Sequence, residues 1–273
     1  MGKEMKKGIK YLIFFALTLI VMLPFFWTLY AAFVKNDLDL NTKILQQGKY
    51  GFENFKYILS RGEIFIWLKN SVITVSAITA ANLLINTMAG YALARFEFKG
   101  KKTIFTYITA SMMIPAQVLV IPIFLIISKL GMINTYAGLI IPFMFNPFGV
   151  FLMRQHFLTF PKEIEEAASI DGLGAFMIFF KVCMPLAKNA LMTQAILIFV
   201  WNWNSFILPS ILVNRQDMFT LPLGMYQLTN TRYVTSITKS MAGAVLTLLP
   251  TIIFYLIFQK RLINNDMNSA VKG

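Results

Sequence analysis

The sequence predicts an all-α membrane protein with six transmembrane helices. Of its 273 residues 57% are hydrophobic, and a mean hydropathy of +0.65 is too high for a soluble domain of this length. Six stretches lack Asp, Glu, Lys and Arg, and each can form one crossing, which needs about 20 apolar residues. They are residues 11–34, 70–94, 103–128, 130–153, 189–214 and 240–259. No repeat or low-complexity linker divides the chain, so we expect one transmembrane domain over residues 1–273.

The basic residues predict which side of the bilayer each loop faces. Six crossings place both termini on one side, and loops rich in Lys and Arg face the cytoplasm. Such residues recur at the N-terminus, in the second-to-third and fourth-to-fifth loops, and in the tail: Lys3, Lys6, Lys7, Lys10, Arg95, Lys99, Lys101, Lys102, Arg154, Lys162, Lys181, Lys188, Lys260, Arg261 and Lys272. The longest opposite segment, residues 35–69, offsets its basic residues with carboxylates. We therefore expect both termini in the cytoplasm. The net charge of +13 is then explained by basic cytoplasmic loops that lie near anionic lipid headgroups, and it does not indicate nucleic-acid binding.

The first, third and fourth predicted crossings have distinctive sequence features. The run that begins at Tyr11 is too long for a signal peptide and lacks a small-residue cleavage site, so we expect it to be retained. The third and fourth stretches contain interior prolines: Pro115, Pro122, Pro142 and Pro147. Each removes a helix hydrogen bond, which suits either a bundle that bends or a static packing feature. Gly131 and Asn134 are expected to form the short turn between these two crossings.

Residues 161–185, PKEIEEAASIDGLGAFMIFFKVCMP, are predicted to form two short cytoplasmic helices with a break at Gly172. Pro161 suits a first helical turn, and the glutamates that follow lie near the positive end of the helix dipole. Ala167 and Ala168 share a small apolar face with Ile164. This composition fits a helix that lies at the membrane interface, or one that docks closely against another protein.

The spacing within this segment favours the second interpretation, because it resembles the EAA loop of ABC importer permeases. Glu166-Ala167-Ala168 is followed after three residues by Gly172, and after nine more by Val182-Cys183-Met184-Pro185, where the family usually has Ile-x-Leu-Pro. The resemblance implies contact with a cytoplasmic ATPase. The residues that it assigns to this coupling are Glu165, Glu166, Ala167, Ala168, Asp171, Gly172 and Pro185.

Further motifs resemble the maltose and multiple-sugar type of permease, in particular its second, smaller subunit. These are Asn70-Ser71, the run YALARFEFKGKK at residues 91–102, and the ending Ala-Val-Lys-Gly at 270–273. The resemblance implies a bacterial plasma membrane, a second homologous permease, an ATPase dimer that binds ATP and Mg²⁺, and an extracytoplasmic sugar-binding (lipo)protein. It also implies that Lys272 and Gly273 reach the ATPase interface, although residues 264–268 depart from the usual tail. Residues 221–233 correspond to an outer loop that enters the binding protein in that type.

A polar cluster in the fifth stretch is the main candidate for the translocation pathway. It comprises Trp201, Asn202, Trp203 and Asn204. Unpaired amides are costly in hydrocarbon and should face the interior, where amides and indole rings suit a sugar. The same residues could instead join helices by hydrogen bonds and packing. Weaker candidates of the same kind are Asn86, Gln117 and Asn146.

The sequence contains no recognisable ATP-binding motif or ion-coupling residue. The six stretches lack the intramembrane ionisable residue typical of ion-coupled carriers, and the chain has no Walker-type GxxxxGK[ST] loop. No metal motif or nucleophile–base set is present, Cys183 has no cysteine partner, and His156 is expected to be an interfacial polar residue. We therefore predict a non-enzymatic permease without a cofactor of its own, driven by a partner ATPase. The alternatives are a permease for glycerol phosphodiesters or polyols, a carrier that works alone, and a membrane scaffold.

Overall fold

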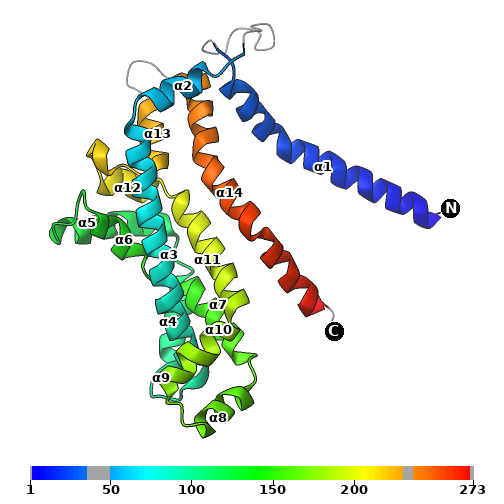
Figure 1. The fold of residues 1–273 in the computed structure, drawn as a ribbon, viewed down its shortest axis with the longest axis vertical. Helices are drawn as coiled ribbons and strands as arrows, with labels where there is room; N and C mark the ends of the chain where they lie inside the picture. The colour runs from blue at the N-terminus through cyan, green and yellow to red at the C-terminus, as the bar shows by residue number, and fades with distance from the viewer. Residues whose placement is uncertain (1, 36–49, 230–235, 271–273) are drawn as a thin grey trace. The chain divides into compact units, whose positions relative to one another are not determined.

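The computed structural model describes the backbone of residues 2–35, 50–229 and 236–270, and it is all-α within those ranges (Figure 1). Two compact units are formed from discontinuous segments. The first comprises Met1–Phe65 and Leu221–Pro250, and the second comprises Ile66–Thr220 and Thr251–Gly273. Helices α3 (Glu63–Arg95) and α14 (Ile237–Ala270) run through the boundaries between these segments.

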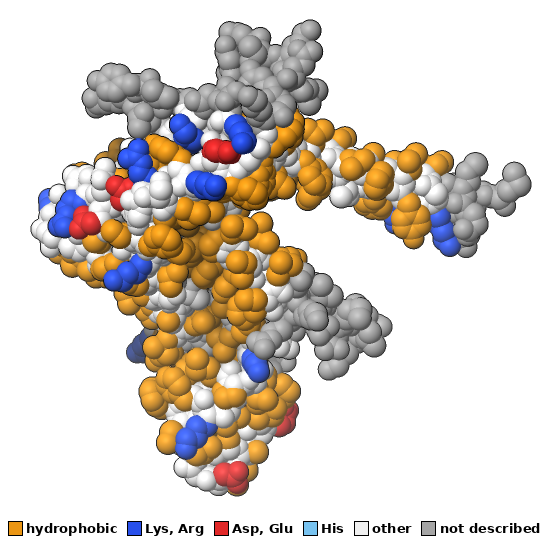
Figure 2. All heavy atoms as spheres, turned by 45° about the horizontal axis from the view of Figure 1, so that its top comes forward, with side chains coloured by type: hydrophobic (Ala, Val, Ile, Leu, Met, Phe, Trp, Pro, Cys, Tyr) orange, Lys and Arg blue, Asp and Glu red, His pale blue; other side chains and the backbone are white. Residues whose placement is uncertain are grey.

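The first unit contains α1 (Gly2–Ala32), α2 (Glu53–Ser60), α13 (Leu221–Thr229) and the first part of α14. The end of α1 is fixed by buried Asn54, whose Nδ2 donates to the carbonyl oxygens of Ala32 at 3.0 Å and Val34 at 2.8 Å. By contrast, the apolar length of α1 from Lys7 to Ala32 has none of its most hydrophobic window buried. Figure 2 shows this helix covered mainly by hydrophobic side chains. A surface of this kind requires lipid or a partner to cover it.

The second unit contains a series of shorter helices. They are α4 (Lys101–Ser111), η2 (Ala116–Leu119), α5 (Val120–Lys129), α6 (Tyr136–Ile140), η3 (Ile141–Phe143), α7 (Pro147–Leu158), α8 (Lys162–Ile170), α9 (Ala175–Ile178), η4 (Phe179–Cys183), α10 (Met184–Leu186), α11 (Lys188–Trp203), α12 (Ile207–Leu212) and η5 (Gln216–Met218). Helix α7 packs against both α4 and α11, and α12 packs against α5 and α6. η4 is a single π-helical segment.

Two of the predicted crossings are bent rather than straight. The axes bend by 96° between α4 and the η2–α5 segment, and by 43° before α7. A third bend, of 77°, lies between residues 175–186 of the predicted coupling segment and α11, which begins the fifth predicted crossing. Pro115 precedes η2 and Pro147 begins α7, so two of the predicted prolines lie at breaks. Three helices in the described chain can cross a membrane by length and composition, or up to six if each bent pair is one crossing. The number of crossings therefore stays a prediction.

The predicted turns have the expected backbone. Gly131 and Asn134 adopt positive φ values of 67° and 58° between α5 and α6. Gly172 has a φ of 84° directly after α8, a conformation that costs a residue with a Cβ about 1–2 kcal/mol. These glycines end their helices at the positions that the sequence predicts.

Candidate coupling and translocation sites

Helix α8 is the structural counterpart of the predicted docking helix. It runs from Lys162 to Ile170 between Pro161 and Gly172. The N–H of Leu173 donates to the carbonyl of Ala168 at 3.1 Å, and that of Gly172 donates to Ser169 at 3.0 Å. This pair of bonds is the Schellman arrangement that satisfies the last carbonyls of a helix. The break at Gly172 is therefore confirmed.

Glu165 joins α8 to the C-terminal end of α3. Its Oε1 accepts from Arg95 Nε at 2.6 Å, and its Oε2 accepts from the Tyr91 hydroxyl at 3.0 Å. Arg95 also donates from Nη2 to the Phe160 carbonyl at 2.7 Å, just before α8. The Arg95 side chain is only 6% exposed and that of Glu165 16% exposed. Solvent screens such a pair little, and loss of one partner leaves an uncompensated charge.

An apolar cluster lies beneath the same helix. Ala168, the inward-facing alanine of α8, is buried with Tyr91, Met153, Phe157 and Phe179. The Tyr91 ring lies 5.2 Å from that of Phe157 and 5.1 Å from that of Phe179, centroid to centroid. These side chains come from α3, α7 and η4. Because close-packed interiors transmit displacement rather than absorb it, a shift of α8 acts on all three elements.

The opposite face of α8 is open. Glu166, Ala167 and Asp171 are exposed, and Ile170 is 87% exposed. Within the described chain Glu166 makes no hydrogen bond or ion pair, in contrast to its neighbour Glu165. The two glutamates that the sequence assigns to one role therefore have different surroundings, one directed inward and one available to a partner. Pro185, in α10, lies between this helix and the 77° bend before α11.

The four polar residues at the end of α11 point in different directions. Trp203 is buried and stacks on Phe199, whereas Trp201 is 48% exposed with its ring near Phe148. Asn202 and Asn204 each donate back to a carbonyl four residues earlier, at 2.8 Å. Successive residues of a helix cannot share one face, so the structure does not bring the four together.

Two predicted pathway residues do meet at a cavity of about 510 Å³ in the second unit. Gln117 from η2 and Asn204 from the end of α11 line it together with Ser205. The remaining wall is largely apolar and includes Phe143 and Leu208. Sequence reasoning did not single out Ser205, which has no signal beyond its place next to Asn204. A mainly apolar wall with a few polar groups is typical of a ligand site.

Asn86 and Asn146 lie elsewhere, in a buried amide network. Asn86 is fully buried, donates to Asn82 Oδ1 at 2.9 Å and accepts from the Asn146 backbone N–H at 3.2 Å. The Asn146 side chain accepts from the Gly149 N–H at 3.2 Å and so caps α7. Gln194 joins from α11 through a 3.3 Å bond to the Asn82 carbonyl. This network joins α3, α7 and α11, and a pathway role for Asn86 and Asn146 stays a prediction.

The remaining predicted sites are only partly described. Residues 221–233, expected as an outer loop, form α13 up to Thr229 and bury Leu221, Leu223 and Met225, while residues 230–233 lie outside the described part. Lys272 and Gly273 also lie outside the described residues.

Long apolar helices, an exposed acidic helix and a cavity with scattered amides are typical of an all-α membrane transport component. Comparison with known families assigns the chain more specifically. It belongs to the family of binding-protein-dependent transport system inner membrane components, whose model matches residues 86–264. Members of this family are permease subunits of multi-subunit transporters and are not enzymes.

Individual relatives agree with this assignment. An arabinooligosaccharides transport system permease from Halalkalibacterium halodurans, AraQ, is 37% identical over 233 residues, which are 85% of this chain and 83% of that protein. The AraQ protein of Bacillus subtilis is 33% identical over 271 residues, covering 96% and 94% of the two chains. A solved chain of a bacterial ABC transporter involved in alginate import has a TM-score of 0.81 at 22% identity, over 95% of this chain and 97% of that one. The last similarity concerns the fold alone.

Proposed function

We propose that the chain is the permease subunit of a carbohydrate importer of the bacterial plasma membrane, and that it imports oligosaccharides. It forms half of the translocation pathway with a second homologous permease. A cytoplasmic ATPase dimer supplies the energy, and an extracytoplasmic binding protein delivers the sugar. The relatives that transport arabinooligosaccharides support the substrate class. Family membership disfavours a carrier that works alone.

The observation that carries the mechanism is the two-sided character of α8. Its outer face offers Glu166 to the ATPase, and its inner face is bonded to α3 through Glu165. When the ATPase closes on ATP, it displaces α8, and Arg95 moves with Glu165. The apolar cluster around Tyr91 passes the same displacement to α7 and η4.

The 77° bend before α11 completes the path to the substrate. Displacement of η4 and α10 tilts α11 about this bend, and the far end of α11 carries Asn204 at the cavity that Gln117 also lines. Movement there changes which side of the membrane the pathway faces. The amides and Ser205 supply hydrogen bonds to sugar hydroxyls, and the apolar wall contacts the ring faces.

Reconstitution tests the proposal. Proteoliposomes that contain the chain and its partner permease, but no ATPase, should not accumulate labelled arabinooligosaccharide. Adding the ATPase, ATP and the binding protein should start uptake. Uptake by the chain alone would refute the proposed division of labour. If the complete assembly took up a polyol but no oligosaccharide, the proposed substrate class would be refuted.

A further inference from the structure

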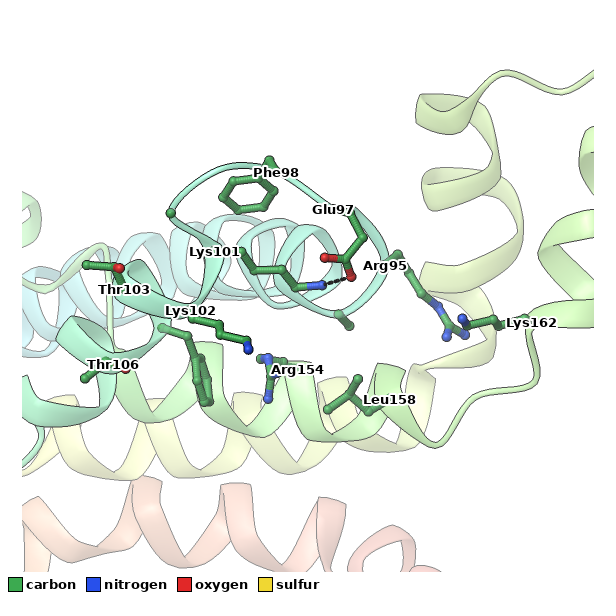
Figure 3. A pocket seen from close by; sticks show the side chains of 13 residues that line it. Arg95, Glu97, Phe98, Lys101, Lys102, Thr103, Thr106, Arg154, Leu158 and Lys162 are labelled. Atoms are coloured by element: carbon green, nitrogen blue, oxygen red, sulfur yellow. Dashed lines mark hydrogen bonds and ion pairs between the residues drawn. The ribbon is translucent and has the colours of Figure 1, made fainter.

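A second, larger cavity of about 850 Å³ lies at the inner ends of three helices in the second unit (Figure 3). Its wall includes Arg95, the last residue of α3, Lys101 at the start of α4, and Leu158 at the end of α7. The cavity does not share a residue with the one that Gln117 and Asn204 line. Its volume falls within the range of about 300–1,000 Å³ that is usual for small-molecule sites.

The wall is strongly cationic. Five basic residues contribute to it, Arg95, Lys101, Lys102, Arg154 and Lys162, against one carboxylate, Glu97. Two of the cations have acidic partners, since Arg95 pairs with Glu165 and Lys101 Nζ lies 2.8 Å from Glu97 Oε1. The hydrogen bond from Lys101 lowers the pKa of Glu97, so this carboxyl is ionised at neutral pH.

The other three cations form no ion pair within the described residues, although the charges of Lys102 and Lys162 also act on Glu97. Figure 3 shows Lys102 and Arg154 directed toward the same part of the cavity. Arg154 is held in place by a 3.3 Å bond from its Nε to the Leu93 carbonyl, and by Phe105, whose ring centroid lies 4.0 Å from Arg154 Cζ. The two Nη atoms of Arg154 are therefore available to bind a ligand in the cavity. Like charges brought together around a cavity favour an anion within it.

The surroundings indicate the kind of anion. Phe98 and Leu158, which line the cavity, are 42% and 46% exposed. Helix α4 buries none of its residues. A charged hollow beside an exposed apolar surface matches a molecule with an anionic head and a hydrocarbon tail. The cavity also lies at the ends of predicted crossings, on the side expected to be cytoplasmic, where lipid headgroups are found.

We propose that this cavity binds the phosphate headgroup of an anionic phospholipid of the inner leaflet, with Lys102 and Arg154 as its phosphate ligands. Thr103 and Thr106, which also line it, add hydroxyl donors. The acyl chains then lie along the exposed side chains of Phe98 and Leu158. The bound lipid occupies the space between the start of α4 and the end of α7, and it borders Arg95, whose contact with Glu165 holds α8.

The test uses the assembled transporter in nanodiscs of phosphatidylcholine with increasing phosphatidylglycerol, with retained lipid counted by native mass spectrometry. Lys102 is exposed and forms no hydrogen bond or ion pair within the described residues, so the variants are Lys102→Gln and Lys102→Glu. A basic residue at the membrane surface is worth about fivefold in affinity, so we expect losses of about fivefold and about thirtyfold. The matched control is Lys99→Glu, an exposed lysine three residues earlier that does not line the cavity. It should retain phosphatidylglycerol like the unaltered protein.

Three results would overturn the proposal. An equal loss of retained phosphatidylglycerol in Lys99→Glu and Lys102→Glu would mean that diffuse surface charge, and not a defined site, holds the lipid. Release of the lipid by inorganic phosphate or glycerol 3-phosphate at low concentration would mean a site for a soluble anion. Cross-linking of a Thr106→Cys variant to the ATPase instead of to a photoreactive phosphatidylglycerol would mean that a protein carboxylate occupies the cavity. The proposal does not depend on the sugar, so failure of the oligosaccharide assays would leave it unaffected.

Discussion

Replacing Arg95 should weaken the attachment of α8 to α3, the helix to which we propose that α8 transmits motion. Arg95→Leu leaves the Glu165 carboxylate, 16% exposed, without its cation. Breaking one side of a buried pair costs about 3–5 kcal/mol. Because Glu165 keeps the Tyr91 hydroxyl and lies on a surface helix, we expect a value near the lower end, about 3 kcal/mol. That is roughly a hundredfold change in the equilibrium constant between docked and undocked α8.

A double-mutant cycle isolates this interaction. Arg95→Leu, Glu165→Gln and the double variant are compared for thermal unfolding of the purified assembly and for sugar transported per ATP hydrolysed. The double variant should be more stable than Arg95→Leu, because it contains no unpaired carboxylate, yet equally poor in coupling. Strictly additive effects on stability, or normal coupling in Arg95→Leu, would refute the argument that this pair transmits motion.

Three further predictions follow from packing and from the cavity. Gly149→Ala should destabilise the assembly by about 1–3 kcal/mol, because the new Cβ would overlap the buried side-chain amide nitrogens of Asn86 and Gln194. Gly174→Ala, where no atom lies within 4 Å, should leave the melting temperature unchanged. Gly172→Ala should cost about 1–2 kcal/mol through its positive φ and lower uptake, and hydrogen exchange should localise the loosening to the end of α8; unchanged exchange there would contradict the expectation. Gln117→Ala and Asn204→Ala should each lower the rate of oligosaccharide uptake while the stability of the assembly is kept, and normal transport in both would remove the cavity from the pathway.

The sequence alone predicts the all-α class, the limits of α8 and the break at Gly172, since each depends on local composition and backbone geometry. It cannot separate Glu165 from Glu166. Neighbouring helical positions point about 100° apart, and which one faces inward depends on Arg95, 70 positions earlier in the chain. The same limit affects the cluster at the end of α11, whose contiguous polar residues the helix distributes among a core, an exposed face and a cavity.

The bends show a related limit. Pro115 predicts an interruption, because proline cannot donate a helix hydrogen bond. The 96° angle at that point depends on how α5 packs against α12, which no local pattern encodes. Likewise, the basic residues of the second-to-third loop predict an inward orientation, whereas the cavity that they line requires Arg154 from a later helix.

The ratio of sugar transported to ATP hydrolysed in a Glu166→Lys assembly tests the central claim most directly. Glu166→Asp, which keeps the charge, is the control. If the open face of α8 receives the force of the ATPase, Glu166→Lys should assemble in the membrane and retain ATP hydrolysis but lose uptake, while Glu166→Asp keeps most of both. Full, ATP-dependent uptake by Glu166→Lys would contradict the account.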